Sequence, residues 1–304
     1  MCALFGFLDY GHRIPTKVLQ RLLQALANAS EIRGNHAAGI AYLKDNSLTI
    51  YKRPKPAHKL HFKLPPGTSA VMGHTRFTTQ GSEKINCNNH PFLGHAGTDF
   101  ALAHNGVLYN DRELRREKHL PETQIETDSY IAVQLLEAQG ELSFESIQQM
   151  AEDVCGSFTF TLLDEDNALW FVKGSSPLYL VHFPEIGLYA YASTKDTMLT
   201  ALKQTLLQYI RREVISIDEG QILRIDAQGN SSCGRFDPFV LAKEYEWELS
   251  YDEELEQLLN ICGCFGVTED EIMQMLEMGY SYDDIEDWLF CPSAYERALM
   301  EGEL

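Results

Sequence analysis

Short apolar runs and alternating apolar and polar residues predict that much of the chain forms β-strands. Residues 2–8 are almost wholly apolar and predict a buried strand. Asn105-Gly106, between the two apolar halves of 100–109, predicts a hairpin turn. The other predicted strands are 39–43, 47–52, 70–76, 157–163, 168–173, 178–183 and 187–193, with a last hairpin over 214–226.

Helical spacing of apolar residues predicts four helices in the same part of the chain. The first begins with Thr16 as its N-cap and places Leu19, Leu22 and Leu26 on one face. The others are predicted over 127–138, 144–154 and 194–207. Because strands cluster at hairpin turns and helices come in pairs, the pattern favours antiparallel sheets covered by helices over alternating βαβ units.

A change of composition near Asp237-Pro238 predicts a domain boundary, with domains at 2–240 and 241–304. The second segment contains Trp247 and Trp288, which a disordered acidic tail would lack. It also has apolar residues at helical spacing, namely Leu255, Leu258, Leu259, Ile272, Met275 and Leu276. We therefore expect a small helical appendage there.

The net charge of −19 is concentrated in this second segment. Residues 241–304 hold 2 Lys or Arg and 18 Asp or Glu, whereas residues 1–240 hold 23 and 26. So negative a chain is not expected to bind the phosphate backbone of a nucleic acid. No apolar run is long enough to span a bilayer, so no membrane partner is expected either.

Seven cysteines, odd in number and scattered, do not indicate a disulfide framework. The N-terminus lacks the features of a signal peptide, so a reducing, cytoplasmic location is expected. Cys262, Cys264 and Cys291 offer three thiols without a nearby histidine, which falls short of the four ligands of structural zinc. Neither a metal nor a cofactor is predicted.

Cys2 is the first candidate for chemistry. Removal of Met1 would leave a thiol and a free α-amine on one residue. The amine can then accept the proton of the thiol, directly or through a water molecule. The alternative is that Cys2 is a small buried apolar residue, which is the commoner fate of a free cysteine.

Three further positions each have a structural and a functional interpretation. Arg76 at a strand end is suited to bind a carboxylate, or is a surface arginine stacked on Phe77. Asn105-Gly106 could donate hydrogen bonds to an oxyanion, or simply form a turn. Asp128 could bind an ammonium group, or stabilise a helix N-terminus. Together with a thiol, the functional interpretations describe a site for an α-amino acid that carries a side-chain amide.

Six short motifs occur along the chain in this order: Cys2 with Gly6, Arg33-Gly34 before Ala38-Gly39, Gly73-His74-Thr75-Arg76-Phe77, Asn88-x-His90-Pro91, His104-Asn105-Gly106 and Thr127-Asp128. In these motifs the chain resembles the class II glutamine amidotransferases over about residues 2–240. The resemblance implies an α+β fold, the four-layer αββα sandwich of the N-terminal-nucleophile (Ntn) hydrolases. The acidic residues 241–304 would be a helical appendage to it.

The resemblance implies a catalytic role for residues at the start of the chain and in the Asn-Gly motif. Cys2 would be the nucleophile, with its own α-amine as the base. Asn105 and Gly106 would form the oxyanion hole. Arg33 would support the Cys2 terminus.

The resemblance also implies how glutamine is bound. Arg76, with Thr79 nearby, would bind the α-carboxylate. Asp128, helped by the carbonyl of Phe77, would bind the α-ammonium group, and His90 would belong to the supporting residues.

Three residues depart from the pattern that is usual in this family: His36 replaces a frequent Asp, Phe77 a Trp, and Gln80 a His. The catalytic set is intact. Residues 241–304 are too few for the synthase or transferase domain that normally uses the ammonia. We therefore expect a stand-alone domain that passes ammonia to a separate acceptor protein, with the acidic segment as the docking element.

The sequence thus predicts an enzyme that hydrolyses L-glutamine to glutamate and ammonia through a Cys2 thioester. Two alternatives stay open. An Ntn amidase acting on another amide or a γ-glutamyl compound would not need Arg76 and Asp128. A non-catalytic glutamine sensor that binds a partner would tolerate retention of Met1.

Overall fold

The computed structural model describes residues 2–45 and 47–237, and beyond them residues 255, 258–259, 261–263, 267–278, 280, 282 and 285. The chain divides into two compact units, Met1–Lys243 and Glu244–Leu304. No helix in the described part of the chain is long and apolar enough to cross a membrane.

The strands of the first unit are β1 (Ala3–Asp9), β2 (Ala37–Lys44), β3 (Ser47–Arg53), β4 (Ala70–Arg76), β5 (Phe92–His95), β6 (Asp99–Leu108), β7 (Gly156–Asp164), β8 (Leu169–Lys173), β9 (Tyr179–Phe183), β10 (Leu188–Ala192), β11 (Glu213–Ile215), β12 (Gln221–Ile225) and β13 (Ser231–Arg235). Its α-helices are α1 (Thr16–Ser30), α2 (Asp111–Glu117), α3 (Tyr130–Gln139), α4 (Phe144–Asp153) and α5 (Lys195–Lys203). Short 3₁₀ helices cover Ala57–Lys59, Asn86–Asn88 and Leu206–Tyr209.

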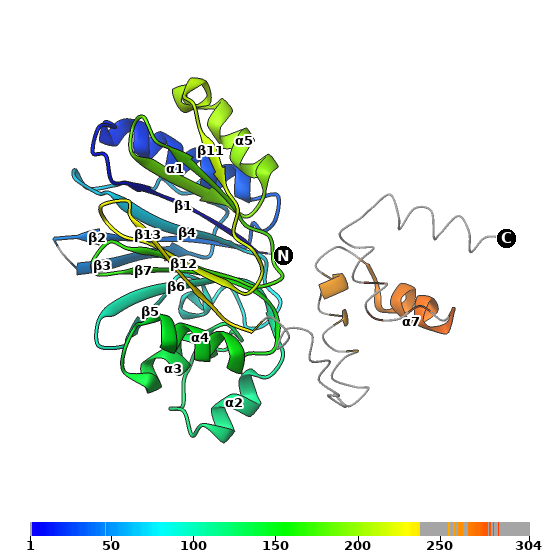
Figure 1. The fold of residues 1–304 in the computed structure, drawn as a ribbon. Helices are drawn as coiled ribbons and strands as arrows, with labels where there is room; N and C mark the ends of the chain where they lie inside the picture. Colours follow the sequence, from blue (N-terminus) through cyan, green and yellow to red (C-terminus); the bar gives the residue numbers. More distant parts are fainter. Residues whose placement is uncertain are drawn as a thin grey trace. The chain divides into compact units, whose positions relative to one another are not determined.

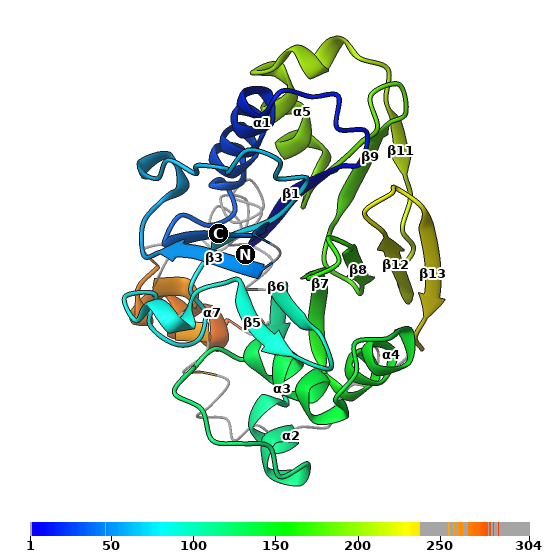
Figure 2. The same ribbon diagram turned by 90° about the vertical axis from the view of Figure 1, so that its left-hand side faces the viewer.

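The strands form two antiparallel sheets. One has the order β11-β9-β10-β1-β4-β2-β3 and the other the order β13-β12-β8-β7-β6-β5. Figure 1 shows α1 and α5 above the first sheet and α3 and α4 below the second, and Figure 2 shows the same layers after a quarter turn. The predicted four-layer αββα sandwich is therefore confirmed.

Apolar side chains fill the spaces between the layers, and the side chains of β1 contribute to two of these spaces. Phe5 and Phe7 pack with α1 and α5, whereas Leu4 and Leu8 lie between the two sheets. Successive side chains of a strand point to opposite faces, so a strand covered on both faces is continuously apolar. This explains the uninterrupted apolar run at the start of the sequence.

The predicted hairpin turn at Asn105-Gly106 is wrong. Both residues lie inside β6, which pairs with β7 without a break from Phe100 to Leu108. Gly106 has a φ of 139°, and a Cβ built on it would lie 1.9 Å from the carbonyl oxygen of Ser157. Glycine is required here because two strands approach closely, not because the chain turns.

Three other local predictions are also wrong. Thr16 is the first residue of α1 and not its N-cap, which is Pro15. Residues 214–226 do not form a hairpin, since β11 pairs with β9 in one sheet and β12 pairs with β8 and β13 in the other. The helix predicted from Thr127 begins at Tyr130, and the Thr127 hydroxyl donates to the carbonyl of Asn88 at 2.8 Å instead of capping the helix. Elements α2, β5 and β13 were not predicted, because each is short and weakly periodic.

The described part of the second unit contains α7 (Glu269–Glu277), which begins with a capping box between Thr268 and Glu271. A separate apolar cluster in this unit consists of Leu258, Cys262, Ile272, Met275 and Ile285. The predicted helical spacing from residue 272 thus falls within α7. Trp247, Trp288, Cys264 and Cys291 lie outside the described residues.

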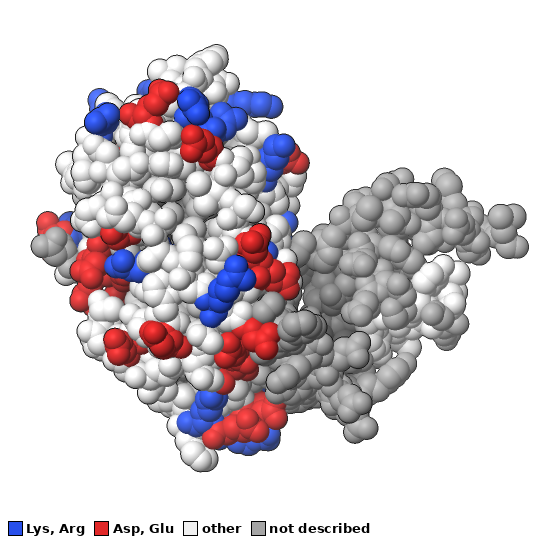
Figure 3. All heavy atoms as spheres, in the orientation of Figure 1, with Lys and Arg blue, Asp and Glu red and all other residues white. Residues whose placement is uncertain are grey.

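Charges of both signs are interspersed on the first unit. On the face drawn in Figure 3, Lys and Arg side chains alternate with Asp and Glu over the described residues. This agrees with the near balance of 23 basic and 26 acidic residues up to position 240.

Candidate functional site

Strand alternation directs three of the predicted site residues into the space between the two sheets. The apolar cluster in that space includes residues of three strands, among them Leu4 of β1, Met72 of β4 and Ala103 of β6. Side chains separated by an even number of residues share a face of a strand. Cys2, Arg76 and Asn105 therefore face the same interior space, the first two from one sheet and the third from the other.

Cys2 precedes β1 and is held by two contacts from neighbouring segments. Its thiol donates to the carbonyl of Phe77 at 3.4 Å, and its carbonyl accepts from the Nε atom of Arg33 at 3.0 Å. Burial raises the pKa of the thiol, Arg76 lowers it, and Asp128 raises it. The thiol is thus within electrostatic reach of both the guanidinium and the carboxylate that the sequence predicts beside it.

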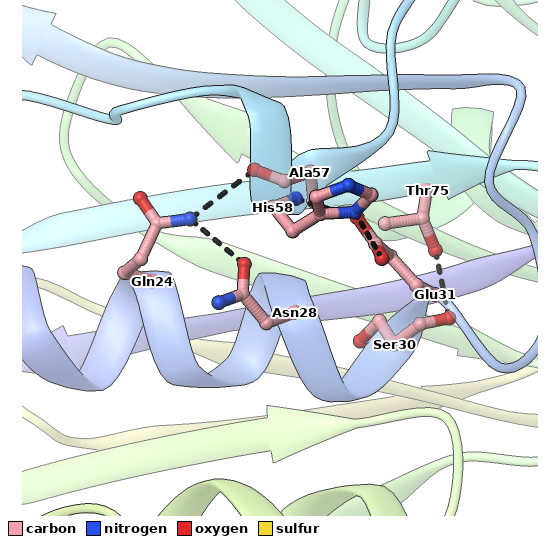
Figure 4. A network of polar contacts seen from close by, with 7 residues as sticks. All are labelled: Gln24, Asn28, Ser30, Glu31, Ala57, His58 and Thr75. Atoms are coloured by element: carbon pink, nitrogen blue, oxygen red, sulfur yellow. Dashed lines mark hydrogen bonds and ion pairs between the residues drawn. The ribbon is translucent and has the colours of Figure 1, made fainter.

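The support given by Arg33 depends on how the end of α1 is anchored. Figure 4 shows this anchoring network. Thr75 of β4 donates to the carbonyl of Ser30 at 3.1 Å, and Glu31 pairs with His58 at 2.9 Å. Arg33 follows three residues after Ser30, so both contacts fix the segment from which it reaches Cys2.

Arg76 ends β4 and is 2% exposed. Its Nη1 atom donates to Oδ1 of Asn89 at 2.8 Å, and its Nη2 atom donates to the carbonyls of Gln80 at 2.6 Å and Gly81 at 2.9 Å. Burial lowers the pKa of Arg76, but Cys2 and Asp128 act in the opposite direction. The interpretation of Arg76 as a surface arginine is wrong, because it is buried and bound on one side only by neutral oxygen atoms.

Asp128 lies in the turn before α3 and is 2% exposed. The backbone N–H of Leu108 donates to its Oδ2 atom at 2.7 Å, and the hydroxyl of Ser129 donates to Oδ1 at 3.2 Å. Burial raises the pKa of Asp128, while these hydrogen bonds and Arg76 oppose the shift. Because the net shift is still upward, this buried carboxylate would gain from a cationic ligand.

Asn105 is fully buried, and neither polar atom of its side-chain amide has a hydrogen-bond partner among the described residues. Buried polar atoms normally find partners, so an amide without one is available to a ligand. Gly106 follows it in the strand, where its positive φ turns the backbone away from regular strand geometry.

The remaining predicted residues surround this centre. Phe77 stacks on His36 with ring centroids 5.0 Å apart, so two of the three departures from the family pattern contact each other. The Nδ1 atom of His36 also accepts from the backbone N–H of Thr78 at 3.0 Å. Thr79 is half-buried in the loop after β4, and no hydrogen bond ties its side chain to another described residue.

Three buried histidines lie beside the centre. The Nε2 atom of His74 lies 2.9 Å from the carbonyl of His104, and the rings of His74 and His90 are 4.2 Å apart. Burial lowers the pKa of His74 and of His104 to about 3, and it lowers the pKa of His90 well below its ordinary value. All three are neutral at pH 7. In the described residues, no group of three His, Cys, Asp or Glu side chains could hold a metal ion.

His90→Phe is expected to make the protein less sensitive to acid. Both ring nitrogens of His90 lack a partner among the described residues, so the substitution removes no hydrogen bond of the protein. Below pH 6.5 the unfolded chain binds a proton at His90 that the folded chain excludes, and stability falls. Between pH 7 and 5.5 this costs about 1 kcal/mol.

The measurement is urea unfolding of both proteins at the two pH values. The stability of the variant relative to the wild type should rise by that amount on acidification, whatever the packing cost of the larger ring. An unchanged difference would mean that folded His90 accepts a proton.

The sequence did not indicate Lys52 or Asn89 as site residues. Asn89 lies in the motif Asn88-x-His90-Pro91, at the position left unspecified, and Lys52 lies far away in the sequence on β3. Lys52 contacts the site through the main-chain carbonyls of Asn89 and Pro91. Asn89 contacts it through Arg76. Only the two consecutive asparagines within this motif could have drawn attention to the segment.

Comparison with known proteins finds relatives of this chain. Residues 74–200 match a family model described as a glutamine amidotransferase domain. Over 246 residues the chain is 30% identical to the glutamine–fructose-6-phosphate aminotransferase (isomerizing) of Staphylococcus aureus, covering 76% of this chain and 38% of that protein. The protein of the same name from Geobacillus kaustophilus is 30% identical over 187 residues, or 59% of this chain and 30% of that protein. The chain therefore spans less than half the length of these relatives.

A solved structure, the glutamine phosphoribosylpyrophosphate amidotransferase of B. subtilis complexed with ADP and GMP, matches with a TM-score of 0.59. It is 21% identical, and the match covers 78% of this chain and 49% of that chain. At this identity the structural match establishes the fold. From the fold, the matched family model and the related sequences, we conclude that the chain contains a glutamine amidotransferase domain of class II, the Ntn-hydrolase type.

Proposed function

We propose that this protein hydrolyses the side-chain amide of L-glutamine to glutamate and ammonia, with Cys2 as nucleophile. The observation that carries the proposal is that the Cys2 thiol donates to the carbonyl of Phe77, the residue after the buried Arg76, while Arg76 and the buried Asp128 both act on the pKa of this thiol. A buried cation and a buried anion near one thiol suit a zwitterionic amino acid whose side chain reaches the sulfur atom. In this proposal Arg76 and Thr79 bind the α-carboxylate, and Asp128 and the Phe77 carbonyl bind the α-ammonium group.

The chemistry begins with a proton transfer. Because burial raises the pKa of the thiol, Cys2 is protonated at neutral pH and needs a base. Once Met1 is removed, the α-amine of Cys2 accepts the thiol proton, and the thiolate attacks the amide carbon of glutamine. The amide of Asn105 and the N–H of Gly106 stabilise the resulting oxyanion.

Collapse of the tetrahedral intermediate breaks the carbon–nitrogen bond. The α-ammonium group of Cys2 returns its proton to the leaving nitrogen, which departs as ammonia and leaves a thioester. Water, deprotonated by the same amine, then attacks the thioester carbonyl. The Cys2 sulfur atom takes back the proton, and glutamate is released.

The test is a substrate panel with the purified protein. L-Glutamine should give equimolar glutamate and ammonia, whereas D-glutamine, N-acetylglutamine and the α-amide of glutamine should not be hydrolysed. Equal turnover of N-acetylglutamine would favour an amidase of broader specificity. Absence of turnover in a preparation whose intact mass shows Met1 removed would overturn the proposal and favour a sensor.

We propose in addition that the ammonia is used by an acceptor protein that docks on the acidic residues 241–304. The relatives carry names that join glutamine to an acceptor, and the charge of −16 in this segment supports an electrostatic association. In a cell extract, nitrogen from amide-labelled glutamine should reach an organic product at low salt. At high salt, which screens such contacts, it should be released as free ammonia. Equal labelling at both salt concentrations would contradict this docking.

A further inference from the structure

We propose that Lys52 is a positioning residue that fixes Arg76 and Asp128 relative to each other. It does so by clamping the segment 87–91, to which both charged residues are attached. This inference rests on the proposed function, because glutamine is the ligand whose binding depends on that spacing.

Lys52 lies near the end of β3, the edge strand of its sheet, and is half-buried. Its ammonium group donates to three main-chain carbonyls of one segment: Cys87 at 3.3 Å, Asn89, and Pro91 at 3.0 Å. A lysine has three N–H donors, and here each has an acceptor. Three carbonyl oxygens that converge on one point would repel one another without the cation between them.

Asn89 connects the clamped segment to Arg76. Its Oδ1 atom accepts from Nη1 of Arg76 at 2.8 Å, and its Nδ2 atom donates to the carbonyl of Glu83 at 2.8 Å. The second bond fixes which end of the amide faces the guanidinium. The carbonyl of the same residue is bound by Lys52. Lysine and arginine are thus joined through a single buried residue.

Asn88 connects the segment to Asp128 in the same way. Its Oδ1 atom accepts from the backbone N–H of Glu126 at 2.9 Å, and its carbonyl accepts from the hydroxyl of Thr127 at 2.8 Å. Asp128 is the next residue. Of the two consecutive asparagines, one therefore binds Arg76 and the other binds the two residues that precede Asp128. Lys52 binds the backbone on either side of them.

Loss of the ammonium group should change glutamine binding more than chemistry. Cys2 and Asn105 are not attached to the segment 87–91 by any hydrogen bond among the described residues, so the reacting groups should keep their geometry. Arg76 and Asp128 bind the α-carboxylate and the α-ammonium group, which do not react. Removing such contacts raises KM with little change in kcat.

The experiment compares Lys52→Met with Lys55→Met, a control that makes the same change at an exposed lysine three residues away. Both are made in the Cys2→Ala protein, and L-glutamine binding is measured by titration calorimetry. Lys52→Met should raise Kd about tenfold, the loss typical of a charge-assisted hydrogen bond, whereas Lys55→Met should change it less than twofold. Thermal unfolding of each variant reports whether the fold is retained.

Kinetics of the two variants with Cys2 intact provide the readout that a merely structural role would not give. Lys52→Met should raise KM about tenfold and change kcat less than threefold. A fall in kcat with unchanged KM, or equal behaviour of the two variants, would overturn the proposal. If Lys52→Met does not fold, Asn89→Leu provides the alternative test: it removes the acceptor for Arg76, leaves the ammonium group of Lys52 in place and should raise Kd about tenfold. An unchanged Kd would overturn the proposal.

The pH dependence gives an independent check. Burial lowers the pKa of Lys52 to about 8. Its charged or titratable neighbours are Cys87 and Arg76. The charge of Lys52 also lowers the pKa of His74 and of His90. Between pH 7 and 9 the clamp should lose its proton, and Kd for glutamine should rise more in the Cys2→Ala protein than in its Lys52→Met derivative. The titration of glutamine itself is common to both and cancels. Parallel curves would overturn the assignment.

These outcomes separate the two proposals. If the wild type hydrolyses no glutamine but Cys2→Ala binds it and Lys52→Met weakens binding, the catalytic proposal fails and the assignment of Lys52 stands. If turnover is normal and Lys52→Met leaves KM and Kd unchanged, only the assignment of Lys52 fails. If glutamine does not bind at all, both fail.

Discussion

Cys2→Ala is expected to lower kcat for glutamine hydrolysis by at least about a thousandfold. The substitution removes the atom that forms the thioester. Asn105 and Gly106 would still polarise the amide, so a small residual rate above the uncatalysed reaction is expected. The measurement is glutamate release in steady state, at enzyme concentrations high enough to detect this residual rate.

Binding should survive the same substitution, because Arg76 and Asp128 remain. The Kd of the Cys2→Ala protein for L-glutamine is therefore expected to stay within a few-fold of the wild-type KM. Cys233→Ala is the matched control, since Cys233 is an exposed free cysteine on β13. If Cys233→Ala loses activity to the same extent, or Cys2→Ala retains it, Cys2 is not the nucleophile.

Asp128→Asn is expected to raise KM for glutamine by two to three orders of magnitude while leaving the protein as stable as before, or more stable. The substrate would bring a buried ammonium group that then lacks its counter-charge, and breaking one partner of a buried pair costs about 3–5 kcal/mol. Without substrate, the substitution is expected to leave the stability of the folded protein unchanged or to raise it. Burial raises the pKa of Asp128, which means that its charge is a cost to the folded protein.

The two effects are measured separately, by kinetics with L-glutamine and by thermal unfolding without it. The Oδ1 atom of an asparagine can still accept from the N–H of Leu108, so the turn before α3 should persist. The outcome that contradicts the role of Asp128 is a large fall in unfolding temperature with an unchanged KM. That result would make the residue an anchor for the turn and not a ligand for the substrate.

The sequence predicted most of the fold because its layers depend on periodicity, which is a local property. The apolar run of β1 indicates a strand that is covered on both faces, and the apolar residues on one side of α1 indicate a helix that is covered on one face. Strand pairing depends on distant partners, and there the local signals failed. Asn105-Gly106 has the composition of a turn, but the strand β7 and the close carbonyl of Ser157 keep it extended.

The candidate site divides in the same way. Side chains with unusual chemistry, such as Cys2, Arg76 and Asp128, could be named from their motifs, and the structure brings these three within electrostatic reach. Lys52 could not, because a lysine on an alternating strand is typical of a solvent-exposed face. Its burial results from the backbone of residues 87–91 folding over the edge of the sheet, which no pattern around residue 52 records.

The two sheets contribute different halves of the proposed reaction centre, with Cys2 and Arg76 on one and Asn105 on the other. The distance from sulfur to oxyanion donor is therefore set by the thickness of the sandwich, and so by apolar side chains such as Phe171 and Tyr191 that separate the layers. Turnover could then be tuned through deep interior substitutions that leave every polar group of the centre in place. In such a protein, substitutions in the apolar interior change the geometry of the reaction centre.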